Sequence, residues 1–235
     1  MNNQQINEAF RTLSTPLIAD ACVRLKLELR MAPAGIKPVS QTMKVAGHVL
    51  PVRHFGSVDV FLEAFQIASP GQVLVIDDGG RNDQACIGDL TAMEARASGV
   101  TGLVVWGSHR DTSELVELGF PVFSYGAFPA GPLVVHHVEQ PELVNVKFGS
   151  LRIVLDDIIF ADADGVMFLD ADEAEAVIAA AHNIHATERR QAERILNGET
   201  LRDQLHFADY LAKRDSNPDY TLRDHLREIG GAIEE

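Results

Sequence analysis

Two glycine-marked loops in the middle of the chain carry residue types suited to enolate chemistry. The first, residues 77–88, leads into Asp89, and the second, residues 107–111, ends with Arg110 and Asp111. Arginine is a permanent planar cation that can grip a carboxylate or stabilise an enolate oxygen, and aspartate offers the hard oxygen ligands of Mg²⁺ and Mn²⁺. An Arg-Asp pair is also typical of a turn or a surface ion pair, so spacing alone leaves both interpretations open.

The first loop adds a candidate site for an anion. Gly88 is expected to open a helix, which leaves the backbone N–H groups of Asp89, Leu90 and Thr91 without partners inside that helix. Such N–H groups bind carboxylates and phosphates, and the helix dipole favours the negative charge. We therefore expect this turn to hold a substrate carboxylate.

The surrounding elements predict that the two loops meet. Short apolar runs alternate with helical patterns over residues 45–125, which is typical of α/β layering. The pattern predicts strands at 44–52, 72–76, 102–106 and 121–124, and helices at 58–67, at 88–98 and from 112. Both loops follow predicted parallel strands, and open α/β sheets bind ligands at the carboxyl ends of their strands.

Further elements are expected on either side. Thr15 is a predicted N-cap ahead of Pro16, and residues 143–169 contain several short strands. The sequence from Asp170 to Glu173 resembles a capping box that opens a long helix to about residue 196. We expect one domain over residues 1–197, and over residues 198–235 a helical tail that contacts a neighbouring subunit.

Composition excludes several classes of protein. The 235 residues include 34 acidic and 20 basic side chains, a formal charge of −14, so direct binding of nucleic acid is not expected. No apolar run approaches the roughly 20 residues of a membrane span, and the N-terminus does not resemble a signal peptide. Cys22 and Cys86 lack metal-ligand spacing, which suits a reducing compartment. We expect a cytoplasmic protein that does not associate with membranes.

Other polar groups have simpler explanations. Two pairs of histidines, His136-His137 and His182 with His185, are more typical of a surface than of a metal site. The run from Asp162 to Gly165 lacks the later ligands of a calcium loop and predicts a β-turn. Asp77-Asp78 ends a strand, where turn residues are common, although these carboxylates could face the site.

A longer pattern around the two loops is more specific. Asp89, Arg110, Asp111 and Glu114 form a D-x20-R-D-x2-E signature. The segments LSTPLIADAC, SPGQVLVIDDGG, ACIGDLTAMEARASGVTGLVVWGSHRDTSEL, LGFPVFSYGAFPAGP and ADADGVMFL accompany it in order. In these motifs the chain resembles the RraA-like family of 4-hydroxy-4-methyl-2-oxoglutarate aldolases. The resemblance covers roughly residues 12–195 and does not include the C-terminal tail.

The resemblance implies a fold and a set of roles. The fold is an α/β, swivelling β/β/α-type domain that assembles as a homotrimer or homohexamer, with the site near a subunit interface. Asp111 would bind the divalent metal, Mg²⁺ or Mn²⁺, and Glu114 would hold a water that tunes it. Arg110 would contact the pyruvate-like ligand, and the turn Gly88, Asp89, Leu90 and Thr91 would hold the substrate. Asp89 would orient or deprotonate a water on the metal.

The implied activity is that of a metal-dependent class II aldolase. Its substrate would be 4-hydroxy-4-methyl-2-oxoglutarate or a related 4-hydroxy-2-oxo acid, cleaved to pyruvate, with oxaloacetate decarboxylase as a companion activity. Two alternatives stay open: a regulator that binds a ribonuclease without catalysis, and a lyase of the same family that acts on another 2-oxo acid. The complete signature, including Glu114, favours catalysis.

Overall fold

The computed structural model describes residues 1–135 and 143–230. Contacts divide the chain into two compact units. The first comprises residues 1–15 and 29–175, and the second comprises residues 16–28 and 176–235. The predicted active-site loops both lie in the first unit.

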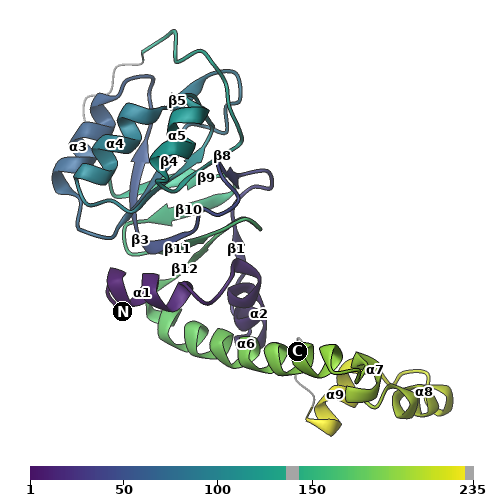
Figure 1. The fold of residues 1–235 in the computed structure, drawn as a ribbon. Helices are drawn as coiled ribbons and strands as arrows, with labels where there is room; N and C mark the ends of the chain where they lie inside the picture. Colours follow the sequence, from purple (N-terminus) through teal and green to yellow (C-terminus); the bar gives the residue numbers. More distant parts are fainter. Residues whose placement is uncertain (136–142, 231–235) are drawn as a thin grey trace. The chain divides into compact units, whose positions relative to one another are not determined.

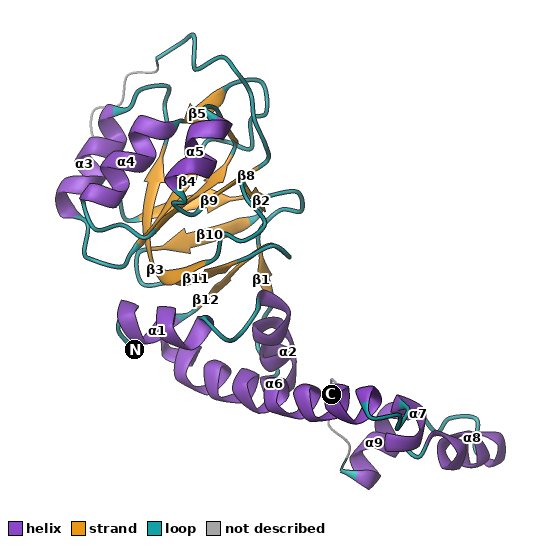
Figure 2. Ribbon diagram, in the orientation of Figure 1, coloured by secondary structure: helices purple, strands orange, loops and turns teal. Residues whose placement is uncertain are grey.

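An eight-stranded mixed sheet forms the centre of the first unit (Figures 1 and 2). Its strand order is β1-β12-β11-β3-β4-β6-β8-β2, and the pairs β3–β4, β4–β6 and β6–β8 are parallel. The strands are β1 (Arg30–Met31), β2 (Lys37–Pro38), β3 (Val45–Arg53), β4 (Val73–Asp77), β6 (Gly102–Trp106), β8 (Val122–Ser124), β11 (Ile158–Ala161) and β12 (Val166–Leu169). The predicted α/β class is confirmed, and the predicted parallel strands agree with the observed ones to within one residue at each end.

Both faces of the parallel strands are covered, because successive side chains point to opposite sides. On one side, Leu74 and Ile76 of β4 pack in a core with helices α3 (Asp59–Ile67), α4 (Asp89–Ala97) and α5 (Thr112–Leu118). On the other, Val73 and Val75 pack against the antiparallel hairpin of β9 (Asn145–Phe148) and β10 (Leu151–Val154). Two buried faces explain the continuous apolar run of β4.

The antiparallel end of the sheet joins distant parts of the chain. Residues 162–165, where the sequence predicts a β-turn, form a bend between β11 and β12 that is closed by a 3.0 Å hydrogen bond from Asp162 N to Gly165 O. The buried Asp162 carboxylate also accepts hydrogen bonds of 2.7 Å from both the backbone N and the hydroxyl of Thr15. Asp162 therefore satisfies both donors of Thr15, which is the first residue of α2, one position later in the helix than the predicted N-cap. Helix α1 (Asn3–Phe10) packs on β3.

The second unit is helical. It contains most of α2 (Thr15–Leu25) and of α6 (Ala174–Leu196), together with α7 (Leu201–Gln204), α8 (Phe207–Ser216) and α9 (Leu222–Ile229). The expected C-terminal helices are thus present. Among the described residues, no helix combines the length and the apolar character needed to cross a membrane.

The predicted capping box ahead of α6 is not formed. Residues 171–173 make a short 3-10 helix, η1 (Ala171–Glu173), and the side chain of Asp170 makes no capping hydrogen bond. The Asp170 carboxylate pairs instead with the guanidinium of Arg30, which also binds the buried Asp157. An ion pair with a residue 140 positions away has replaced the local cap.

Candidate functional site

Two short strands bring the predicted loops together. β5 (Ala85–Ile87) and β7 (Ser108–His109) lie inside the segments expected to be loops and pair in parallel. The backbone N of Arg110 donates a 2.9 Å hydrogen bond to the carbonyl O of Ile87. Gly88 and Arg110 therefore follow directly from paired strands, which sets the two loop ends side by side. Strands of two or three residues are too short to show a periodic pattern, and the sequence did not predict them.

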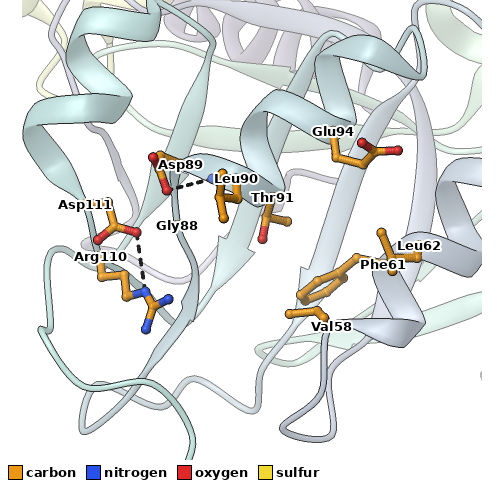
Figure 3. Close-up of a pocket in the computed structure, with 10 residues that line it drawn as sticks. All are labelled: Val58, Phe61, Leu62, Gly88, Asp89, Leu90, Thr91, Glu94, Arg110 and Asp111. Carbon is orange, nitrogen blue, oxygen red and sulfur yellow. Dashed lines mark hydrogen bonds and ion pairs between the residues drawn. The ribbon is translucent and has the colours of Figure 1, made fainter.

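The two loop ends form one side of a surface pocket with a volume of about 240 Å³ (Figure 3). Across it lie the apolar side chains of Val58, Phe61 and Leu62, from α3 and the residue before it. The pocket is lined by Val58, Phe61, Leu62, Gly88, Asp89, Leu90, Thr91, Glu94, Arg110 and Asp111. Every predicted catalytic, substrate-binding and metal-binding residue except Glu114 is in this set, although what each residue does there stays a prediction.

The first residues of α4 line the pocket between the two sides. Gly88 is its N-cap and has an extended backbone, and the helix begins at Asp89. The carboxylate of Asp89 accepts a 2.7 Å hydrogen bond from Leu90 N, so one of the three amides expected to be available for substrate already has a partner. The positive end of the helix dipole still faces the pocket, where it favours an anion.

Asp111 occupies a conformation that side chains rarely adopt. It is the N-cap of α5 with φ of 59°, in the left-handed region, which costs about 1 kcal/mol for a residue other than glycine. Its Oδ2 lies 3.3 Å from Nε of Arg110, and about half of the Arg110 side chain is exposed. A Cβ on Gly88 would overlap that same Oδ2. Glycine at position 88 therefore provides the space in which the Asp111 carboxylate lies.

Both ring nitrogens of His109 form hydrogen bonds that hold the turn at Asp111 in place. Its Nδ1 is 2.6 Å from the hydroxyl of Ser124, and its Nε2 is 3.0 Å from the hydroxyl of Thr112, the first residue of α5. Burial lowers the pKa of His109, and the negative charge of Asp111 opposes that shift. A neutral ring with one donor and one acceptor nitrogen matches two hydroxyl partners. His109 thus holds the loop and is not among the residues that line the pocket.

The pocket contains residues that the sequence did not indicate. Glu94 is exposed on α4, five positions after Asp89, and adds a third carboxylate to the lining. Val58 and Leu62 are exposed, whereas Phe61 is buried. In the sequence, the signal for this side of the pocket was an apolar residue, Leu62, on the outward face of the predicted helix. Glu114 is exposed in the first turn of α5 and lies outside the lining set.

The donor chemistry fits a hard divalent cation. The Asp111 carboxylate is about one-third exposed at the pocket, and Asp89 and Glu94 are the other carboxylates that line it, with Glu94 on the far side in Figure 3. Mg²⁺ and Mn²⁺ bind carboxylate oxygens and retain several waters, so a few protein ligands at an open pocket are sufficient. Asp111, with Asp89 beside it, would hold such an ion.

The carboxylates of Asp77 and Asp78 do not line the pocket. Asp77 accepts a hydrogen bond from Gly79 N, as a turn residue does, and its carboxylate is 3.8 Å from Arg53. Asp78 is buried and bonds to the Nδ1 of His54 at 2.8 Å and to Nη2 of Arg81 at 2.6 Å. The interpretation as turn residues holds for Asp77, whereas Asp78 belongs to a buried polar cluster.

The thiol of Cys86 completes that cluster. Burial, with the charge of Asp78 adding to it, raises the pKa of this thiol well above its ordinary value. Of the histidines considered earlier, His182 is exposed and His185 half-buried on α6, as expected for a helix surface. His136 and His137 lie outside the described residues.

Comparisons with known proteins agree with this geometry. A family model named RraA-like and described as Aldolase/RraA matches residues 15–168, more than half of the chain. A protein of Halalkalibacterium halodurans named "Putative 4-hydroxy-4-methyl-2-oxoglutarate aldolase" is 32% identical over 172 residues, which cover 72% of this chain and 78% of that protein.

Solved structures show the same fold. An uncharacterized protein from Pseudomonas syringae pv. tomato superposes with a TM-score of 0.73 at 24% identity, covering 84% of this chain and 95% of the other. The RNA-processing inhibitor RraA from Thermus thermophilis gives a TM-score of 0.55 at 27% identity, covering 64% of this chain and 91% of the other. On the family match and the fold together, this chain belongs to the RraA-like family.

Proposed function

We propose that this protein is a divalent-metal-dependent carbon-carbon lyase that releases pyruvate from 4-hydroxy-4-methyl-2-oxoglutarate or a related 4-hydroxy-2-oxo acid. One observation carries the proposal: the guanidinium of Arg110, the carboxylate of Asp111 and the N-terminus of α4 line a single pocket. Its volume of about 240 Å³ is below the roughly 300–1,000 Å³ of sites for drug-sized ligands, which suits a small acid.

The proposed binding mode uses both sides of the pocket. The carboxylate of the 2-oxo acid lies against the start of α4, within reach of the cationic Arg110. The apolar side formed by Val58 and Leu62 faces the far end of the substrate, where the methyl group on C4 is its apolar part. A divalent cation, Mg²⁺ or Mn²⁺, would be held by Asp111 and would supply Lewis-acid polarisation of the 2-oxo group when bound.

Cleavage breaks the bond between C3 and C4 of the substrate. The electron pair moves into the 2-oxo group and forms the enolate of pyruvate, whose oxygen is stabilised by the guanidinium of Arg110. C4 becomes the carbonyl carbon of a second pyruvate, and its hydroxyl proton passes to a base, for which the Asp89 carboxylate is the candidate. Return of a proton to C3 of the enolate then completes the first pyruvate. Oxaloacetate gives the same enolate by loss of CO₂, and that reaction needs no base.

The assembly follows from the family resemblance as a further proposal. We expect a homotrimer or homohexamer in the cytoplasm, with the small acid as its ligand and without nucleic acid or membrane partners. Removal of the residues after Gly198 is expected to shift the assembly on a sizing column, since these helices would contact a neighbouring subunit. An unchanged elution volume would contradict this role for the tail.

The test is pyruvate release, coupled to lactate dehydrogenase, from 4-hydroxy-4-methyl-2-oxoglutarate and from oxaloacetate. The wild type is compared with Asp111→Ala, in Mg²⁺ or Mn²⁺ and in EDTA. Metal-dependent release that is lost in the variant is the expected result, and the ratio between the substrates ranks aldolase against decarboxylase. Release that persists in EDTA or in Asp111→Ala would refute the metal-enolate mechanism. Inactivity of the wild type on both acids would point to another 2-oxo acid.

Similarity to the RNA-processing inhibitor from Thermus thermophilis supports a second candidate, a regulator that binds a ribonuclease. The two functions separate by mutation. If Arg110→Ala and Asp111→Ala left the biological effect of the protein unchanged, that effect would not depend on the pocket, and the binding function would be favoured.

A further inference from the structure

A cluster of potential metal ligands lies inside the first unit, formed by residues that are not part of the pocket lining. One donor atom each from His54, Asp78 and Cys86 lies within 4.8 Å of the others. All three residues are buried, with exposed fractions of 4%, 1% and 5%. They come from three separate segments: the residue after β3, the residue after β4, and the middle of β5. His54 and Asp78 are brought together by the sheet, since β3 and β4 are parallel and their last residues, Arg53 and Asp77, pair with each other.

One oxygen of this cluster has no protein partner. Oδ1 of Asp78 accepts from Nδ1 of His54 and from Arg81, whereas its Oδ2 is buried without a hydrogen bond from the described residues. Burying an unpaired carboxylate oxygen is costly, and such atoms in folded proteins usually have an ion or a water as partner. Gly107 lies beside this oxygen, and a Cβ there would come within 2.9 Å of Oδ2. Glycine at position 107 therefore lets the backbone pack directly against the buried Asp78 carboxylate, where a larger residue would overlap it.

We propose that His54, Asp78 and Cys86 form a second divalent-metal site, of the type that binds Zn²⁺, separate from the carboxylates of the pocket. Nitrogen, sulfur and oxygen donors of this kind are the ligands of zinc, whereas Mg²⁺ and Mn²⁺ favour oxygen alone. The proposal depends only on this cluster, so it stands whether or not the pocket catalyses aldol cleavage.

Binding requires a defined exchange of bonds. The thiol of Cys86 becomes a thiolate and its proton leaves to solvent. The ring proton of His54 moves from Nδ1 to Nε2, so that the hydrogen bond from Nδ1 to Asp78 is replaced by bonds from Nδ1 and from the Asp78 carboxylate to the cation. Oδ1 of Asp78 can keep its hydrogen bond from Arg81 while Oδ2 binds the cation. Three protein ligands leave one tetrahedral position for water.

The site would act on the pocket through one aromatic contact. The ring of His54 stacks on Phe61, with centroids 5.2 Å apart and planes inclined by 17°. Phe61 in turn lines the pocket opposite Arg110. A cation that fixes His54 would therefore hold that side of the pocket in place.

The experiment uses the full-length protein, stripped with EDTA and then titrated with Co²⁺ as a spectroscopic substitute for zinc. We expect a thiolate-to-cobalt charge-transfer band that saturates at one Co²⁺ per chain and is displaced by Zn²⁺. The band should be absent in Cys86→Ala and retained in Cys22→Ala, which changes the other buried cysteine in the same way. It should also be retained in Asp111→Asn, which separates this site from the proposed catalytic cation.

The proposal would be overturned by absence of the band in the wild type, by a band that persists in Cys86→Ala, or by loss of the band in Cys22→Ala. If Cys86→Ala does not fold, as judged by circular dichroism, the band in the wild type and in Cys22→Ala still decides whether Cys86 binds the cation. One proton released per chain on addition of Zn²⁺, measured with a pH indicator in weak buffer, supports thiolate ligation, and its absence contradicts it.

Discussion

Replacing Gly88 with alanine is expected to disable the pocket while leaving the fold intact. The backbone of Gly88 is extended, with φ of −142°, so alanine adopts it without strain. The new methyl group overlaps Oδ2 of Asp111 and lies 3.3 Å from Cγ of Arg110. The perturbation is therefore purely steric, and it acts on the two side chains to which the proposal assigns cation and substrate binding.

The structure gives a magnitude for each effect. Relief of the overlap needs a shift of about 1 Å by the Asp111 carboxylate, and misplacement of that size costs about 100-fold in rate, or about 3 kcal/mol in activation free energy. The side chains of Arg110 and Asp111 are 52% and 34% exposed, so they can move toward solvent. The loss of folding stability should therefore stay near 1 kcal/mol, the low end for an overpacked site.

The assay is kcat/KM for pyruvate release, with the free energy of unfolding in urea measured in parallel. Gly119→Ala is the control: Gly119 ends the same helix that Asp111 begins, has φ of 63°, and has open space around its Cα. Alanine there should cost about 1 kcal/mol of stability through backbone strain and leave kcat/KM unchanged. The reasoning would be refuted if Gly88→Ala retained kcat/KM within about threefold of the wild type.

Three further predictions follow from separate parts of the first unit. Arg110→Lys should keep the charge but lose the planar fork, lowering kcat/KM for both acids by at least about tenfold, and equal activity would rule out a guanidinium role. Asp162→Ala should lower the free energy of unfolding by about 3 kcal/mol, because it leaves two buried donors of Thr15 without an acceptor. A decrease of less than about 1 kcal/mol in a urea titration would contradict this. Burial lowers the pKa of His48 below its ordinary value of 6.5. As the pH falls below 6.5, His48 is therefore protonated in the unfolded chain before it is protonated in the folded one, and the free energy of unfolding decreases. Between about pH 7.5 and about pH 5, the Tm of His48→Gln should therefore fall by less than that of the wild type. An equal fall would show that His48 does not contribute to the pH dependence of stability.

Much of the architecture follows from local patterns. The run at β4 is apolar on both faces, as a central parallel strand must be, and its observed bounds differ by one residue from those expected. The loop ends at Gly88 and Arg110 were predicted to meet because both follow parallel strands. Even so, the pairing of β5 with β7, which actually joins them, could not be foreseen from two and three residues.

The sequence by itself determined the α/β class, the order of the central elements and the membership of Gly88, Asp89, Arg110 and Asp111 in one candidate site, because periodicity and motif spacing are local properties. Only the tertiary structure decided which partner each polar group takes. Asp162 bonds to Thr15, 147 positions away, and Asp170 pairs with Arg30 in place of a local cap. The buried meeting of His54, Asp78 and Cys86 is of the same kind. Such contacts depend on where the folded sheet places distant segments, and that information is absent from any short stretch of sequence.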